Sequence, residues 1–357
     1  MVTHPHPIVA ATCPIALRNN ILCLPVSVIP IKINLSLAFF PYLWHNRQAL
    51  QISVRRTSMA TKSSRLQQTL SSGLLVLAAV IWGASFVAQR VGNETVGPLT
   101  FISLRSLLAS TALLPLVCFR VFKMRKSGNS QALRPLIVGG LCCGLMLTFA
   151  SSLQQIGMVT TSAGKAGFLT GLYMLMVPIV SLILFKKKVS PAVWVGVVLA
   201  LIGMYLLCVK EDFTITAGDF YVFLCAVCYT GHILCIDHFA PKVDGVLLSC
   251  AQFYVCGFLT LIPTLFIEQP TLSAIQSVWM PIAYSGIGSG SIAFTLQIIG
   301  QKHVQPTLAS LLMSLESVFS AIFGWLLLNE QLSDKELLGC ILVFGAVPLA
   351  QIPSKKQ

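Results

Sequence analysis

Charged residues are scarce in this 357-residue sequence. Asp, Glu, Lys and Arg together make up 10% of it, whereas hydrophobic residues make up 55%. A water-soluble domain carries roughly 25% charge, so a soluble core with a solvated surface is excluded. The apolar residues come in runs of about twenty, which suffices to cross the roughly 30 Å hydrocarbon layer as a helix. The period-two alternation of a membrane-spanning strand is also lacking, so the lipid bilayer is expected to be crossed by helices.

Acidic residues are missing from the start of the chain. The sequence has 11 acidic and 24 basic residues, a formal net charge of +13, and its first carboxylate is Glu94. Seven of the basic residues lie within the first 65 positions, which leaves +6 spread over short connecting segments. Basic residues in the short loops of a membrane protein are explained by its topology, because they mark the loops on the cytoplasmic side. We therefore expect no nucleic-acid partner.

Disulfide spacing is absent as well. Most of the twelve cysteines lie inside apolar runs, as Cys142, Cys143 and Cys340 do. A buried thiol behaves as a small hydrophobic group. We therefore predict that the cysteines are free thiols. No cofactor is expected.

Residues 1–58 do not match the rest of the chain. The apolar stretch 21–44 contains three prolines and a lysine, and interior proline disfavours a spanning helix. One interpretation, which we favour, takes Met59 as the true start. The other interpretation is that residues 1–58, which contain Arg and Ser but no acidic residue, form a cleaved or disordered leader. On either interpretation this atypical extension is excluded from the predicted fold.

The rest of the sequence predicts ten transmembrane helices. Their approximate ranges are 71–90, 98–119, 135–156, 165–185, 191–209, 218–236, 246–267, 278–300, 306–328 and 336–353. Alternate connectors hold most of the Lys and Arg, such as Arg120 and Lys123, and the others hold most of the acids, such as Glu268. Because cytoplasmic loops are enriched in basic residues, both termini are predicted to be cytoplasmic, in the plasma (inner) membrane.

The ten spans form an internal repeat. AVIW at 79–82 matches AVCY at 226–229, an offset of 147, and Gly140 and Gly144 match Gly286 and Gly290, an offset of 146. Residues 71–209 and 218–353 are therefore two five-helix copies. An odd number of spans inverts the second copy, and inverted repeats around a midplane cavity are the architecture of many secondary transporters. The four glycines are predicted to allow close helix packing.

Several motifs occur in a characteristic order. They are Trp82–Gln89, Leu104–Ser106, Thr161–Tyr173, Val177–Pro178, Ser314–Phe319 and Leu328–Ser333. In this order they resemble the EamA-type branch of the drug/metabolite transporter superfamily, over about 71–353. The resemblance implies a ten-helix transporter that exports or exchanges small metabolites, amino acids or drugs. The sequence departs from the family at Ser317, where proline is frequent, and at Lys186–Lys188, where the family has a glutamate-containing turn.

Glu316 is the leading candidate site residue. It lies in the middle of the apolar stretch 308–330, and an ionisable residue at that depth is costly and usually functional. It aligns with Tyr173 at an offset of 143, so both are expected in a cavity between the copies. Glu316 could bind a cation or a substrate amine, or carry a coupling proton. The alternative is a structural carboxylate hydrogen-bonded to a neighbouring helix.

Four further residues are candidates for substrate binding or coupling. Arg105 could hold a substrate carboxylate, pair with Glu316, or reach toward the membrane surface. Lys165 begins a span within a glycine-rich stretch, where a helix N-terminus could bind an anion; the alternative is a lysine that reaches the lipid headgroups. Trp82 and Tyr229 align across the copies and are either cavity-lining or packing residues.

The leading hypothesis is a secondary transporter, monomeric or homodimeric, that moves a small metabolite, amino acid or drug-like solute by efflux or exchange.

A soft-metal transporter is an alternative, because Cys225, Cys228, His232 and Cys235 fall within about 80° on one helical face. One face seldom supplies a tetrahedral set, so no metal site is predicted. A membrane-embedded enzyme would need a nucleophile–base or paired-acid set, and none is apparent. A receptor or scaffold would need an extramembrane domain.

Overall fold

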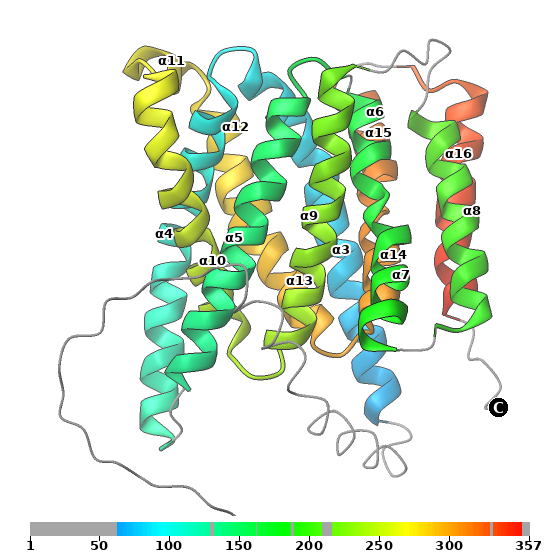
Figure 1. The fold of residues 1–357 in the computed structure, drawn as a ribbon, viewed down its shortest axis with the longest axis horizontal. Coiled ribbons are helices and arrows are strands. Elements are labelled where there is room, and N and C mark those ends of the chain that lie inside the picture. Colours follow the sequence, from blue (N-terminus) through cyan, green and yellow to red (C-terminus); the bar gives the residue numbers. More distant parts are fainter. Residues whose placement is uncertain are drawn as a thin grey trace, which may run out of the picture. The chain divides into compact units, whose positions relative to one another are not determined.

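A computed structural model describes residues 63–128, 132–161, 163–186, 189–208, 216–328 and 331–351. All of them belong to one unit, Thr61–Gln357. The predicted extension at residues 1–58 lies outside the described part, as do Ser162, Lys187, Lys188, Asn329 and Glu330 of the quoted motifs. The described residues form helices and no strand, which confirms the all-α class (Figure 1).

The helices of the first copy are α3 (Ser63–Asn93), α4 (Pro98–Lys126), α5 (Leu133–Gly157), α6 (Ala163–Gly171), α7 (Tyr173–Phe185) and α8 (Pro191–Cys208). Those of the second copy are α9 (Ala217–Phe239), α10 (Gly245–Pro263), the π-helix η1 (Thr264–Glu268), α11 (Leu272–Ser277), α12 (Trp279–Ala283), the π-helix η2 (Tyr284–Ala293), α13 (Phe294–Gln301), α14 (Pro306–Met313), α15 (Glu316–Leu328) and α16 (Asp334–Ala350).

Eight segments among the described residues are long and apolar enough to cross a membrane. The predicted fifth and tenth spans correspond to α8 and α16, which are shorter and pack against each other. The 17 residues of α16 rise by about 25 Å, somewhat less than the hydrocarbon layer. The predicted count of ten is therefore approximate: eight full-length spans and two shorter helices.

Helix contacts follow the repeat. α4 packs against α10, its counterpart, just as α8 packs against α16. α3 packs against η2 and α13, and the equivalent contact joins α9 to α5. In Figure 1, α3 begins at the lower end of the bundle and α9 at the upper end. The two copies thus interleave in opposite orientations, which fits the inverted repeat.

Carboxylates from one copy help to fix helix ends of the other. Glu268 accepts hydrogen bonds from the backbone N–H groups of Leu99 (2.9 Å) and Thr100 (2.7 Å) at the start of α4. A carboxylate there satisfies unpaired N–H groups and complements the positive helix end. At the opposite end of the same helix pair, Arg120 of α4 lies 3.7 Å from Asp244, which caps α10. The central pair α4–α10 is therefore linked at both ends.

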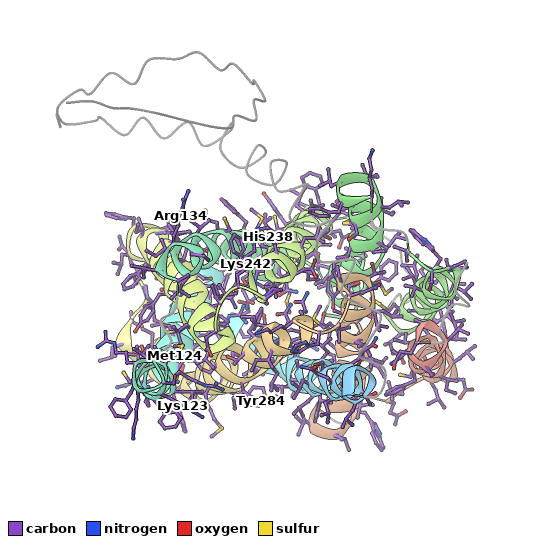
Figure 2. All side chains as sticks on the ribbon, turned by 90° about the horizontal axis from the view of Figure 1, so that it is seen from below. Lys123, Met124, Arg134, His238, Lys242 and Tyr284 are labelled. Atoms are coloured by element: carbon purple, nitrogen blue, oxygen red, sulfur yellow. The ribbon has the colours of Figure 1, made fainter. Side chains whose placement is uncertain are left out.

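Basic residues gather at one end of the bundle. Figure 2 views this end and labels Lys123 near the end of α4, Arg134 near the start of α5, and His238 and Lys242 at the end of α9. Two of the predicted cytoplasmic connectors, 120–134 and 237–245, thus have their basic residues at the end of the bundle where α3 also begins (Figure 1). Assignment of this side to the cytoplasm stays a prediction.

The four predicted packing glycines lie at close helix contacts. A methyl group on Gly144 of α5 would lie 2.5 Å from the Cβ of Val255 in α10, and one on Gly140 would lie 2.7 Å from the Cβ of Ala251. In the second copy, Gly286 and Gly290 of η2 approach the backbone oxygen of Arg105 and the Cβ of Ala109 in α4 in the same way. These contacts allow α5 to approach α10 closely and η2 to approach α4 closely.

Candidate functional site

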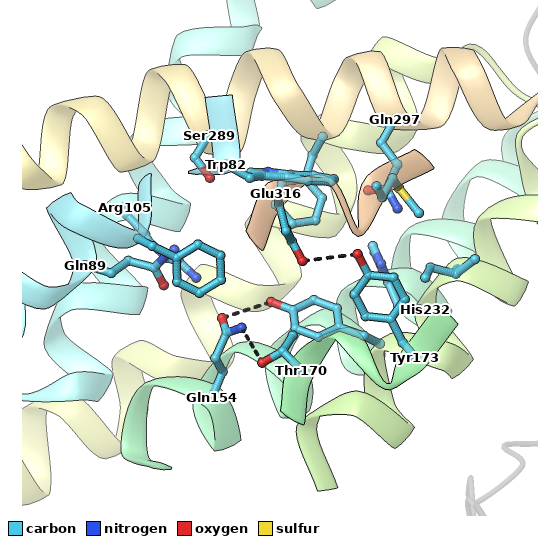
Figure 3. A pocket seen from close by; sticks show the side chains of 15 residues that line it. Trp82, Gln89, Arg105, Gln154, Thr170, Tyr173, His232, Ser289, Gln297 and Glu316 are labelled. Carbon is cyan, nitrogen blue, oxygen red and sulfur yellow. Dashed lines mark hydrogen bonds between the residues drawn. The ribbon is translucent and has the colours of Figure 1, made fainter. Parts of the chain in front are cut away.

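A cavity of about 50 Å³ lies between the two copies (Figure 3). Both copies contribute side chains to its wall. The first copy supplies Trp82, Phe86, Gln89, Arg105, Gln154, Thr170 and Tyr173, and the second supplies Tyr229, His232, Ile233, Ser289, Phe294, Gln297, Met313 and Glu316. Five of the six predicted binding or coupling residues therefore meet in one place: Glu316, Arg105, Tyr173, Trp82 and Tyr229.

Two equivalent helix breaks position the centre of this wall. α6 ends at Gly171 and α7 begins at Tyr173; α14 ends at Met313 and α15 begins at Glu316. At each break the backbone makes tighter i to i+3 bonds, from Leu172 N to Leu169 O and from Leu315 N to Leu312 O. Broken helices at the repeat interface are typical of transporter binding sites, because irregular backbone is tolerated where it lines a cavity.

Tyr173 and Glu316 join the two breaks. The Tyr173 hydroxyl donates a hydrogen bond to Oε1 of Glu316 across 3.1 Å, and Glu316 is only 8% exposed. The second carboxylate oxygen makes no hydrogen bond with a described residue. Figure 3 shows the carboxylate pointing into the space between the helices. The site thus offers one acidic group with spare hydrogen-bonding capacity.

Arg105 supplies the opposite charge. It is 8% exposed, and its guanidinium lies 5.9 Å from the ring centre of Phe101, a cation–π contact. Among the described residues it makes no hydrogen bond and no ion pair, so the predicted alternative of pairing with Glu316 is not formed. In Figure 3 the two charged groups occupy separate places on the wall.

Aromatic rings form much of the remaining wall. Trp82 and Phe294 stand edge to face with centroids 4.9 Å apart, and Tyr173 and Tyr229 stand 6.5 Å apart. His232 continues this series, 5.9 Å from Phe294. Edge-to-face pairs are favourable beyond the burial of their area, so this wall is a packed surface against which an apolar group can lie.

Amides and hydroxyls complete the cavity. Gln154 donates to the Thr170 hydroxyl at 3.1 Å and accepts from the Tyr229 hydroxyl at 3.5 Å (Figure 3). From the sequence, glutamines within the spans, such as Gln89, Gln154 and Gln297, are cavity candidates because buried amides need partners, but the sequence does not rank them. It also does not single out Phe86, Thr170, Ser289, Phe294 or Met313. The helical spacing of 82, 86 and 89 was a usable signal for Phe86 and Gln89, because i, i+4 and i+7 share a helix face.

Lys165 lies outside this cavity. Its ammonium is 2.7 Å from Oδ2 of Asp219, and both side chains are largely buried. Asp219 also accepts from the Thr161 hydroxyl at 2.9 Å and from the Thr216 backbone N–H at 2.8 Å. The start of α6 is thereby tied to the start of α9.

The predicted Cys/His stripe does not form a ligand cluster. Among the described residues no three His, Cys, Asp or Glu side chains gather closely enough to hold a metal ion. His232 faces the cavity, but its Nε2 is hydrogen-bonded with Oε1 of Gln252 at 3.0 Å. Cys225, Cys228 and Cys235 are free thiols. The soft-metal alternative gains no support here.

Comparison with known proteins gives one consistent result. The model of the EamA-like transporter family matches this chain twice, at residues 70–209 and 216–350. An uncharacterized transporter of Archaeoglobus fulgidus is 25% identical over 312 residues, covering 87% of this chain and 94% of that protein. The uncharacterized inner membrane transporter YedA of Escherichia coli K12 is 24% identical over 284 residues, covering 77% and 89%. A solved structure described only as the crystal structure of a protein shares the fold, with a TM-score of 0.67 at 19% identity over 79% of this chain and 96% of that one.

Proposed function

Because the chain belongs to the EamA-like transporter family and is thus a multi-pass membrane transporter, we propose that it moves a small organic solute by alternating access through the cavity between its two copies. Family and relatives support transport rather than catalysis. The solute, the coupling and the direction are the proposed part. We further propose a plasma (inner) membrane protein with both termini in the cytoplasm, as the basic end of the bundle suggests.

The cavity itself is the observation that carries this proposal. It lies where helices of both copies meet, and it holds an arginine and a glutamate that are both 8% exposed. Charged groups at this depth are costly and mark solute or ion pathways. A fold-stabilising role would favour pairing the two charges, whereas here they stand apart.

Alternating access has a structural basis in the repeat. Each copy has one broken span at the cavity, and Tyr173 and Glu316 link the two breaks. Rocking one copy against the other would move these half-helices about the cavity and open it to each side in turn. The two states need differ only in how equivalent helices pack, since the copies share one architecture.

Glu316 is the proposed proton carrier. Its carboxylate has one hydrogen-bond donor, the Tyr173 hydroxyl, and spare acceptor capacity toward the cavity. Uptake of a proton would remove a costly buried charge, and release would restore an acceptor for the solute. Coupling to a proton gradient follows if protonation and solute occupancy favour different states.

Reconstituted liposomes test this role. Glu316→Gln should abolish solute uptake driven by a pH gradient, because the amide cannot exchange a proton, while leaving the fold intact by melting temperature. Glu94→Gln is the matched control, since Glu94 is exposed and lies outside the cavity. Unchanged gradient-driven uptake in Glu316→Gln would refute proton coupling at this residue.

A further inference from the structure

We propose that the solute carries a carboxylate, which binds the guanidinium of Arg105, on an apolar body that packs against the aromatic wall. This inference rests on the proposed function and names its substrate class. It starts from a buried cation for which the described residues supply no hydrogen-bond acceptor.

Arg105 has unused hydrogen-bonding capacity. A guanidinium presents five N–H donors in one plane, and none of them donates to a described residue. The Phe101 ring covers part of the cation but accepts none of its N–H groups in a conventional hydrogen bond. Since Arg105 is 8% exposed and lines the cavity, a solute in the cavity is the natural source of acceptors.

Neighbouring carboxylates do not fill that role. Ion pairs of arginine or lysine in the described residues join Arg120 to Asp244 and Lys165 to Asp219. Glu268 is bound to the start of α4, and Glu316 is bound to Tyr173. These four described carboxylates bind other groups and not Arg105, which therefore remains open to an anion in the cavity.

Geometry and charge favour a monocarboxylate over a larger anion. A planar guanidinium matches a carboxylate through two parallel N–H···O bonds. The cavity wall also contains Glu316, whose negative charge would repel a multiply charged anion such as a phosphate ester. Trp82, Tyr229 and Phe294 provide edge-to-face rings for an apolar body. A compact organic acid meets all three conditions.

A matched set of solutes separates the contribution of the carboxylate to binding from that of an ammonium group. 3-Phenylpropanoate carries the carboxylate alone, 2-phenylethylamine the ammonium alone, and phenylalanine both, on the same phenyl body. Sets with an isobutyl and an indole body extend the panel. Binding to the purified full chain is measured by thermal shift and by competition for uptake into liposomes, since a ligand of the native state stabilises it. Carboxylate-bearing members should bind and amines should not.

Arg105→Gln should weaken binding of the carboxylates by roughly ten- to hundred-fold, the effect of losing hydrogen bonds to a charged group. The affinity of Arg105→Lys for carboxylates should lie between those of the wild type and of Arg105→Gln, because lysine keeps the charge but cannot form two parallel hydrogen bonds to a carboxylate. Arg134→Gln is the control, because Arg134 is an exposed cation at the end of the bundle. Arg105→Met tests folding: removing an unpaired buried charge should leave the ligand-free melting temperature equal or higher.

Three results would overturn the inference: amines that bind as well as acids, an Arg105→Gln protein that keeps carboxylate affinity, or a panel in which no carboxylate binds. The proposed function would stand in each case if another solute is taken up in a manner that depends on Glu316. It would fail separately if no solute is moved and Glu316→Gln changes nothing. The difference in affinity between phenylalanine and 3-phenylpropanoate reports whether an ammonium group also binds Glu316. Either order of affinities agrees with a carboxylate bound to Arg105.

Discussion

At the scale of single residues, the shared cavity position of Tyr173 and Glu316 is what the repeat offset predicted most directly, although it did not predict a hydrogen bond between them. An offset of 143 aligned the two positions, and the structure places a 3.1 Å hydrogen bond between them. Equivalent residues of two inverted copies lie symmetrically about the axis that relates them, so they meet only where they lie close to that axis, as these two residues do. The partner of Lys165 could not be found in this way, because Asp219 is not its counterpart in the repeat.

Tyr173→Phe should destabilise the protein by about 1 kcal/mol, the net value of a typical hydrogen bond. It also removes the tether that orients Glu316, so gradient-driven transport should slow while binding persists. Thermal unfolding in detergent and liposome uptake measure the two effects. Tyr205→Phe is the control, because Tyr205 is 47% exposed on α8.

A double-mutant cycle with Glu316→Gln checks that the tyrosine acts through the glutamate. Directly coupled residues show non-additive effects. Because Glu316→Gln alone should already abolish gradient-driven uptake, the cycle is measured by thermal unfolding: Tyr173→Phe should cost less stability in the Glu316→Gln background than in the wild type. Additive losses would assign Tyr173 a role that is independent of Glu316.

At the scale of helices, the sequence predicted which segments span the membrane but not where they break. Proline and glycine mark many helix ends, yet the break at Ser314–Leu315 contains neither. The π-helix η2 follows from a run rich in Gly and Ser that has weak intrinsic preference, so its form is decided by packing against α3 and α4. The shortness of α16 does have a sequence signal, since Asp334, Lys335 and Glu336 cannot lie deep in the hydrocarbon layer.

The α5–α10 contact gives a test of helix packing. Gly144→Ala should destabilise the protein by about 1–3 kcal/mol, because the added methyl group would lie 2.5 Å from the Val255 Cβ and must force the helices apart. Gly345→Ala in α16 is the matched control: nothing lies within 4 Å of its added methyl group, so the change should be neutral or slightly stabilising. Equal melting temperatures for the two variants would show that the contact is loose.

The start of α4 gives a second test at this scale. Glu268→Gln should cost about 1 kcal/mol, because the carboxylate that accepts from Leu99, Thr100 and the Thr100 hydroxyl loses its charge at a positive helix end. Glu94→Gln, which changes an exposed acid, should leave the melting temperature unchanged. A variant as stable as the wild type would mean that water replaces the cap without loss.

At the scale of the whole molecule, the contact between α6 and α9 and its counterpart in the repeat, between α14 and α3, are held together differently. Lys165 and Asp219 tie α6 to α9 by an ion pair. At the offsets of 143 and 147, their counterparts are Leu308 and Ser72, which are buried but cannot form an ion pair. The repeat is therefore symmetric in its helices and asymmetric in the contacts that join them, and we expect this asymmetry to bias which of the two helix pairs separates more readily.

Native thiols can report that bias. Cys225 of α9 is fully buried, and its sulfur lies 4.0 Å from the Thr170 hydroxyl of α6, so separation of these helices would expose it. Cys143 is equally buried but belongs to a different cluster, with Ile236 and Leu248. Their alkylation rates, measured by mass spectrometry on the reconstituted protein, separate a local opening from general unfolding.

Lys165→Gln should raise the alkylation rate of Cys225 several-fold and leave that of Cys143 unchanged. The reason is that the substitution leaves Asp219 as a largely buried carboxylate without its cation, and breaking such a pair from one side is costly to the closed state. Lys165→Gln combined with Asp219→Asn removes both charges and should restore much of the protection. If Cys225 and Cys143 respond together, the ion pair supports the fold as a whole; if neither responds, α6 and α9 remain joined by packing alone and the pair does not control their separation.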